Sequence, residues 1–193
     1  LHYPLRRQRQ MCIRDRQVRF GPRKMAAEGR TMLGSEQYDW LLNKIETSSA
    51  KWNMLGNSVM FSPMNLATLQ QDDKTKPVSS SLSSNITGIP VNGDQWDGYS
   101  AERRLLIDAL SKHDSHTLFV TGDIHSEWAH NISKDGRIFG AEMVCASVSA
   151  PNVNEQLKLP EGNELSKLAE RYLMGANPHT RHVDLDHHGY SFV

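Results

Sequence analysis

The chain has 193 residues, the length of one domain, and its 38% apolar and 23% charged residues are typical of a globular protein. No stretch approaches the roughly 18 continuous apolar residues of a membrane-spanning helix, and the first residues lack the apolar core of a signal peptide. The formal net charge is zero, but residues 5–24 contain eight basic residues and one acidic residue, so the remainder of the chain is acidic.

The basic segment at the start of the chain allows two interpretations. A basic arm ahead of an acidic body is typical of nucleic-acid binding, which gives a nucleic-acid-binding module without catalysis as an alternative function. The stretch RRQRQMCIRDR also resembles the translated library-adapter sequence found at the ends of metagenomic gene fragments. We favour the second interpretation. It divides the chain into a non-native or disordered segment, residues 1–17, and a partial domain, residues 18–193.

The first half of the chain contains two predicted helices separated by a strand and a long loop. Apolar residues recur at i, i+3, i+4 and i+7 in residues 34–48, which predicts a helix. Residues 51–61 form an apolar run typical of a buried strand, interrupted by a Gly-Asn pair. Residues 62–99 are rich in Ser, Gly, Pro and Asn, which predicts a long loop. A second helix is expected over residues 100–113.

The second half of the chain adds further alternating elements. Apolar runs predict strands over residues 117–121 and 141–151, and helical spacing predicts a third helix over residues 163–175. The last residues, 180–193, have the pattern of a terminal hairpin. Because helices and strands alternate along the chain, we expect an α/β fold.

The stretch LFVTGDIHSEW, residues 118–128, presents a carboxylate and an imidazole directly after a strand. Asp123 offers a hard anionic oxygen and His125 a borderline nitrogen, a pair that suits iron, zinc or manganese. Open α/β sheets place ligand sites at the carboxyl ends of their strands. The pattern therefore indicates a metal site, although a turn Asp and a helix-capping His would give the same letters.

Two more stretches contain polar groups that need an explanation. Asn57 lies within the apolar run 51–61, where an unpaired buried amide would cost about 1–3 kcal/mol, so it needs a hydrogen bond or a cation. It could equally be satisfied by backbone at a bulge. Trp96 and Tyr99 flank Asp97 just before the second helix. These three form either an aromatic lip beside a polar pocket or a hydrophobic staple with an acid near a helix start.

Together these stretches resemble the alkaline phosphatase D (PhoD-like) family of metallophosphoesterases. The resemblance implies a four-layer αββα sandwich with a metal cluster between its two sheets. It also implies metal-dependent hydrolysis of phosphate monoesters and diesters, iron and calcium as cofactors, a small-molecule phosphate ester as substrate, no nucleic-acid partner, and a periplasmic or secreted location. The matching blocks are residues 29–64, 94–110, 117–132, 141–151 and 177–190.

Carried onto this sequence, the family pattern places Asp123 and His125 in the last metal-binding motif. It makes Asn57 a metal ligand or an amide directed at the metal-bound oxygen. His188 also matches a family position, without an assigned role. The upstream metal motifs of the family have no counterpart in this sequence. We therefore expect a C-terminal fragment with little or no activity by itself.

Overall fold

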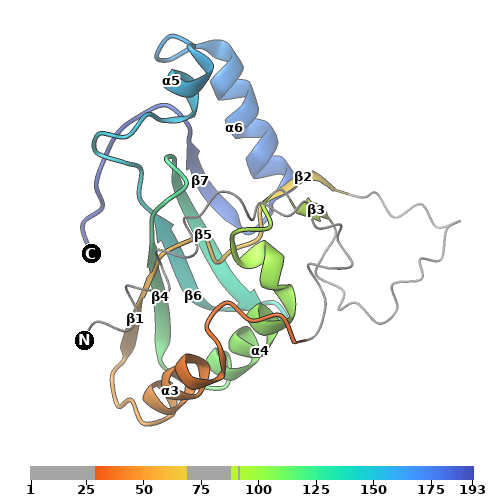
Figure 1. Cartoon of the computed structure of the whole chain (residues 1–193), viewed down its shortest axis with the longest axis vertical. Coiled ribbons are helices and arrows are strands. Elements are labelled where there is room, and N and C mark those ends of the chain that lie inside the picture. Colours follow the sequence, from red (N-terminus) through yellow and green to blue (C-terminus); the bar gives the residue numbers. More distant parts are fainter. Residues whose placement is uncertain (1–28, 69–87, 91) are drawn as a thin grey trace, which may run out of the picture.

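The computed structural model describes residues 29–68, 88–90 and 92–193 (Figure 1). The predicted basic segment lies outside these residues, as does much of the predicted loop 62–99. In the described residues no helix is long and apolar enough to cross a membrane. In chain order the elements are α3 (Ser35–Glu46), β1 (Trp52–Asn57), β2 (Asn65–Thr68), β3 (Gly88–Pro90), the 3-10 helix η2 (Trp96–Tyr99), α4 (Ser100–Leu110), β4 (His116–Thr121), β5 (Glu127–Lys134), β6 (Arg137–Val144), α5 (Val153–Leu157), α6 (Glu164–Ala176) and β7 (Thr180–Asp184).

The main sheet of the described residues has five strands in the order β1-β4-β6-β5-β7. Strands β1, β4 and β6 are parallel, and β5 runs antiparallel to both β6 and β7. Strands β2 and β3 form a separate antiparallel pair. This mixed sheet with its helices confirms the predicted α/β class. Because β1, β4 and β6 are parallel, their carboxyl ends meet at one edge of the sheet.

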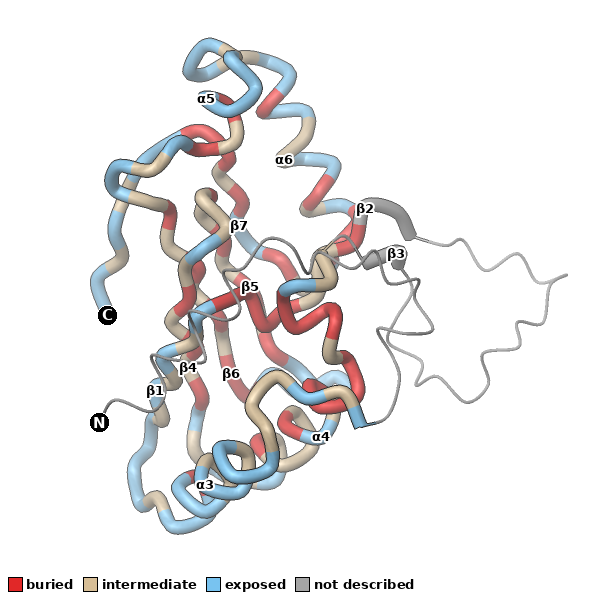
Figure 2. Tube along the Cα trace, in the orientation of Figure 1, coloured by how far each residue is buried: buried red, intermediate tan, exposed pale blue. Residues whose placement is uncertain are grey.

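Two apolar clusters lie on the same face of this sheet, beneath the helices. The first joins Ile45 of α3 and Leu106 of α4 to Phe119 of β4. The second joins Leu173 of α6 to Val144 of β6. Phe119 is paired with Glu142, two residues before Val144, so both clusters face the same way. In Figure 1, α3 and α4 lie near one end of the sheet and α6 near the other, and Figure 2 shows the buried residues concentrated between them.

The opposite face of the sheet is less covered. Trp52 and Met54, on β1, are 61% and 59% exposed, and the next two strands add half-buried apolar residues, Leu118, Val120 and Met143. The prediction of a buried strand over residues 51–61 is therefore wrong in its burial, because β1 is an edge strand with alternating exposure. It is also too long, since β1 ends at Asn57.

Three helices match their predicted positions, but other predictions fail. The strand predicted over residues 141–151 is β6, which ends at Val144, and the described part of the predicted loop 62–99 contains β2, β3 and η2. The predicted terminal hairpin is wrong: only β7 forms, and it pairs with β5 instead of with the residues that follow it. Strand β5 was not predicted from the sequence. It is joined to β6 by the turn Asp135-Gly136, whose residues have φ values of 51° and 80°. An Asp-Gly pair between two strands is the usual signal of such a hairpin.

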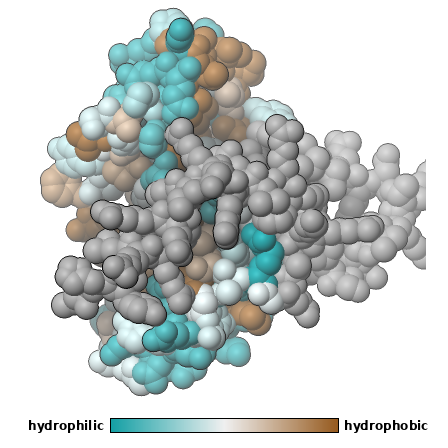
Figure 3. Space-filling view, in the orientation of Figure 1, coloured by the Kyte–Doolittle hydropathy of each residue, from teal (hydrophilic) through white to brown (hydrophobic). Residues whose placement is uncertain are grey.

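Helix α6 has an apolar side that is only partly buried. Leu173 packs in the second cluster with Ala169, while Leu165, Leu168 and Tyr172 lie along the edge of the same side and are exposed. Figure 3 shows hydrophobic side chains gathered beside α6. The sequence pattern thus identified the apolar side of this helix, but the sheet covers only part of it.

Candidate functional site

The predicted metal residues lie at the edge where the parallel strands end. In the sheet register Asn57 of β1 pairs with Thr121 of β4, and Thr121 pairs with Val144 of β6. The chain leaves β4 through Gly122, and Asp123 and His125 follow directly. This is the strand-end position at which α/β sheets bind ligands.

The backbone at Asp123 and His125 is strained. Their φ values are 75° and 57°, in the left-handed region that residues with a side chain rarely adopt. The amide of Ile124 bonds to the carbonyl of Gly122 at 3.0 Å, which closes a tight turn around Asp123. Such conformations cost roughly 1–3 kcal/mol each and occur preferentially at functional sites. The turn places the carboxylate and the imidazole at the end of β4.

The imidazole of His125 is held in one orientation by Pro151. Its Nδ1 lies 2.9 Å from the carbonyl oxygen of Pro151. Because a carbonyl oxygen only accepts hydrogen bonds, Nδ1 carries the proton and Nε2 keeps its lone pair. A metal-binding histidine has this arrangement, with one nitrogen donating to a carbonyl and the other free for the ion.

Asp123 and His125 fit a transition metal but do not complete its coordination. The carboxylate of Asp123 is exposed and makes no hydrogen bond or ion pair within the described part of the chain. Iron accepts both donor types, whereas calcium prefers an all-oxygen shell, to which only Asp123 would contribute. No group of three or more His, Cys, Asp or Glu side chains in residues 29–68, 88–90 and 92–193 is placed to hold a metal.

Asn57 is held by neighbours on both sides of its amide. Its Oδ1 accepts a hydrogen bond from Nε1 of Trp96 at 3.2 Å. Its Nδ2 donates to the carbonyl of Val59 at 2.5 Å and lies 3.5 Å from Oγ1 of Thr121. The indole only donates and the carbonyl only accepts, so the amide orientation is determined. Asn57 therefore ties η2 to the strand edge, and its predicted role toward a metal stays a prediction.

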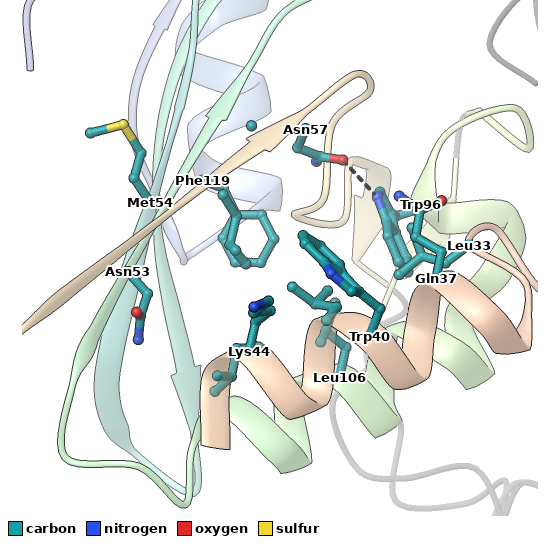
Figure 4. Close-up of a pocket in the computed structure, with 14 residues that line it drawn as sticks. Leu33, Gln37, Trp40, Lys44, Asn53, Met54, Asn57, Trp96, Leu106 and Phe119 are labelled. Carbon is teal, nitrogen blue, oxygen red and sulfur yellow. Dashed lines mark hydrogen bonds between the residues drawn. The ribbon is translucent and has the colours of Figure 1, made fainter. Parts of the chain in front are cut away.

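The three predicted pocket residues occupy η2 in different environments. Trp96 is 2% exposed and lines, with Asn57, a cavity of about 320 Å³ between α3 and β1 (Figure 4). Asp97 is 3% exposed and forms an ion pair with Arg103 at 2.7 Å. The guanidinium carbon of Arg30 lies over the ring of Tyr99, 4.6 Å from the centre of that ring. Trp96 thus reaches the cavity, while Asp97 and Tyr99 are not among the residues that line it.

Comparisons with known proteins identify the family. A sequence model of the PhoD-like phosphatases matches residues 5–193. The chain belongs to the PhoD-like phosphatase family. It is 32% identical over 168 residues to alkaline phosphatase D of Bacillus subtilis (strain 168), a match that covers 83% of this chain and 24% of that protein. A solved PhoD structure is similar with a TM-score of 0.59 and 27% identity, covering 84% of this chain and 27% of its own.

The described PhoD-like chain also contains a buried carboxylate that the sequence analysis missed. Glu142 of β6 is fully buried and accepts hydrogen bonds from the amides of Phe61 and Ser62 at 2.8 and 2.7 Å. It also accepts one from Oγ1 of Thr121 at 2.7 Å. Burial raises the pKa of Glu142, an effect that these hydrogen bonds oppose. The signal in the sequence that could have identified Glu142 is a charged residue within an alternating, apolar strand.

His130 of β5 is a second buried polar group near this carboxylate, and the sequence analysis missed it as well. It pairs with Glu142 across the sheet, and its Nδ1 lies 3.0 Å from Oγ1 of Thr180. Burial lowers the pKa of His130 to about 3, with a smaller contribution from His179. The imidazole is therefore neutral at physiological pH.

Proposed function

We propose that this chain supplies part of the metal centre of a PhoD-like phosphatase that hydrolyses phosphate monoesters or diesters, with Asp123 and His125 as metal ligands. The observation that carries the proposal is the strained turn after β4, together with the Pro151 hydrogen bond that leaves Nε2 of His125 available. Family membership supports the reaction class. When bound, the metals would polarise the phosphoryl oxygens and lower the pKa of a bound water toward 7.

The residues of the chain would divide this work by position. Asp123 and His125 would hold the cation at the end of β4. Asn57 would stand beside them, either as a ligand or with its amide directed at a metal-bound oxygen. Trp96, Asp97 and Tyr99 would form one wall of the substrate pocket. Iron is the metal that the Asp-His pair suits, and calcium would depend on oxygen ligands from elsewhere.

The rest of the enzyme would complete both the fold and the site. The chain spans 24% of the Bacillus subtilis relative that it matches. The less covered face of the sheet, with Trp52 and Met54 exposed, is consistent with packing against the second sheet of a four-layer sandwich. Because two ligands cannot neutralise a dinuclear centre, we expect little or no hydrolysis by residues 18–193 alone. A periplasmic or secreted location follows from the same family resemblance.

Metal binding by the chain tests the ligand assignment. Co²⁺ serves as a spectroscopic substitute for iron, and its visible absorption reports binding through nitrogen and oxygen. We expect weak one-to-one binding that the replacements Asp123→Ala and His125→Ala each reduce by about ten-fold or more. The matched controls are Asp114→Ala and His116→Ala, which alter an Asp-x-His triplet at the other end of β4. Equal affinity in all four variants would refute the assignment.

A further inference from the structure

The loop that follows β6 is held at both of its ends by histidines. At its start, the carbonyl of Ser147 lies 2.9 Å from Nδ1 of His188. At its end, the carbonyl of Pro151 accepts the hydrogen bond from Nδ1 of His125. The loop, residues 147–151, therefore connects the candidate metal ligand to a histidine near the end of the described chain. Since the orientation of His125 depends on where the Pro151 carbonyl lies, it depends on what holds this loop.

Glu155 holds the far end of the same loop. Its Oε2 lies 3.1 Å from Nε2 of His188 and accepts a hydrogen bond from the amide of Asn152 at 2.9 Å. The side chain of Asn152 in turn accepts a hydrogen bond from the amide of Glu155 at 2.9 Å, which completes a capping box at the start of α5. The carbonyl of Pro151 and the amide of Asn152 belong to the same planar peptide unit, so the hydrogen bond from this amide to Glu155 helps to fix the carbonyl that orients His125.

We infer that His188 and Glu155 are positioning residues for His125. They hold residues 147–152 so that the Pro151 carbonyl keeps the proton of His125 on Nδ1 and presents Nε2 outward. The importance of this for metal binding rests on the proposed function, whereas the orientation and tautomer of the ring do not. Groups that orient a metal-binding histidine typically affect metal affinity by about 10–100-fold when removed.

The neighbouring histidine provides a matched control. Nδ1 of His187 lies 2.7 Å from Oδ2 of Asp184, and its Nε2 lies 3.8 Å from Glu161. Neither of these two partners belongs to the loop 147–151. Two adjacent histidines in one segment thus differ in the property under test, because His188 contacts the loop and His187 does not.

The test uses the full chain labelled with ¹⁵N at histidine. Long-range NMR spectra report which nitrogen of His125 carries the proton, and His125→Gln assigns the signal. We expect the wild type and His187→Ala to show the Nδ1–H form, and His188→Ala to show a mixture of both tautomers. Glu155→Gln keeps an acceptor oxygen, so its effect should be smaller than that of His188→Ala. Co²⁺ affinity should fall in the same order, by about ten-fold for His188→Ala.

The outcomes separate this inference from the proposed function. A wild type that binds no Co²⁺ but shows the expected tautomers would contradict the metal site and support the positioning network. A wild type that binds Co²⁺, with His188→Ala matching it in both tautomer and affinity, would overturn the network alone. If His188→Ala proves unfolded by circular dichroism, Glu155→Ala decides, because it removes the acceptor oxygen altogether. An unchanged His125 tautomer together with unchanged Co²⁺ affinity in a folded Glu155→Ala would also overturn the inference.

Discussion

The two ends of strand β4 have the same spacing of acid and imidazole but different surroundings. Asp114 and His116 stand at its amino end, and Asp123 and His125 follow its carboxyl end. At the amino end neither residue has a positive φ, and the His116 ring lies against Trp52 with centroids 4.9 Å apart. At the carboxyl end both residues are strained and the His125 ring is fixed by Pro151. An Asp-x-His spacing alone therefore does not define a site, and the backbone must also orient both side chains.

The strongest test of this difference between the two ends of β4 is to measure hydrolysis in a complete enzyme. Residues 29–193 would replace the matching part of Bacillus subtilis alkaline phosphatase D, and aryl phosphate hydrolysis would be followed with iron and calcium present. Loss of a metal ligand should exceed the ~10–100-fold effect of groups that only orient one. We expect Asp123→Ala and His125→Ala to lower kcat/KM by about 10³-fold.

The opposite end of β4 supplies the control in the same chimera. Asp114→Ala and His116→Ala should change kcat/KM by less than about two-fold, because both residues lie at the opposite end of β4 from the proposed metal ligands. If the two pairs of variants lose activity equally, the distinction between the two ends of the strand fails.

The hydrogen bonds made by polar side chains near the two ends of β4 should also differ in how much they stabilise the fold. Glu142→Ala would leave the amides of Phe61 and Ser62 and the hydroxyl of Thr121 without their buried acceptor. We expect a loss of about 3 kcal/mol in the free energy of unfolding, since each unsatisfied buried group costs roughly 1–3 kcal/mol and water will relieve part of this. Urea denaturation measures it.

Near the amino end of β4, the corresponding hydrogen bonds are made by a partly buried side-chain amide. Asn53 accepts a hydrogen bond from Ser48 at 2.8 Å and donates one to Ser115 at 2.8 Å. Because water can replace these bonds, Asn53→Ala should cost only about 1 kcal/mol. A larger loss for Asn53→Ala than for Glu142→Ala would reverse the expected ranking.

The pH dependence of stability should come from two buried groups beside the carboxyl end of β4, His130 and Glu142. The pKa of His130 is lowered from 6.5 to about 3, so between these values the unfolded chain binds more protons than the folded one. Its contribution to stability is therefore present above pH 6.5 and is lost as the pH falls toward 3, by at most about 1.4 kcal/mol per pH unit.

The contribution of Glu142 to stability changes with pH in the opposite direction from that of His130, so the two contributions can be separated. Its pKa is raised above 4.5, so its contribution to stability is present at low pH and is lost as the pH rises through the folded-state pKa. His130→Gln should flatten the decline of stability below pH 6.5, and Glu142→Gln should not. Thermal unfolding of the three proteins between pH 4 and 7.5 would show this, and an identical slope for His130→Gln and wild type would contradict it.

The sequence predicted the strand that carries the site better than the contacts that shape it. The apolar run before Gly122 and the Asp-x-His letters identify the end of β4 without any structure. Nothing local reveals that Asn57 bonds to Trp96 or that Glu142 bonds to Ser62, since these pairs are 39 and 80 residues apart in the chain. Such contacts depend on the parallel register of three strands, which a single sequence does not specify.

The predicted buried strand and terminal hairpin failed for a related reason. An apolar run shows that a segment can be buried but not which neighbour it has, and Trp52 and Met54 lie on an edge strand. Likewise, the sequence of residues 180–193 favours extended chain, but β7 pairs with β5 and not with the residues that follow it. Strand pairing is decided by the whole sheet, so local periodicity predicts strands more reliably than it predicts their partners.

The smallest expected difference concerns two tryptophans, one at each end of β1. The indole of Trp96 donates to Asn57 from a site that is 2% exposed, whereas Trp52 is 61% exposed and lies against the His116 ring. Trp96→Phe removes one buried hydrogen bond and should cost about 1 kcal/mol in the free energy of unfolding, while Trp52→Phe should cost less than about 0.5 kcal/mol. Urea denaturation of both variants measures the pair, and Asn57→Ala combined with Trp96→Phe tests for coupling. Strictly additive losses in that double variant would mean that the indole does not hold Asn57 at the strand end, because residues that share a hydrogen bond must lose less together than the sum of their single losses.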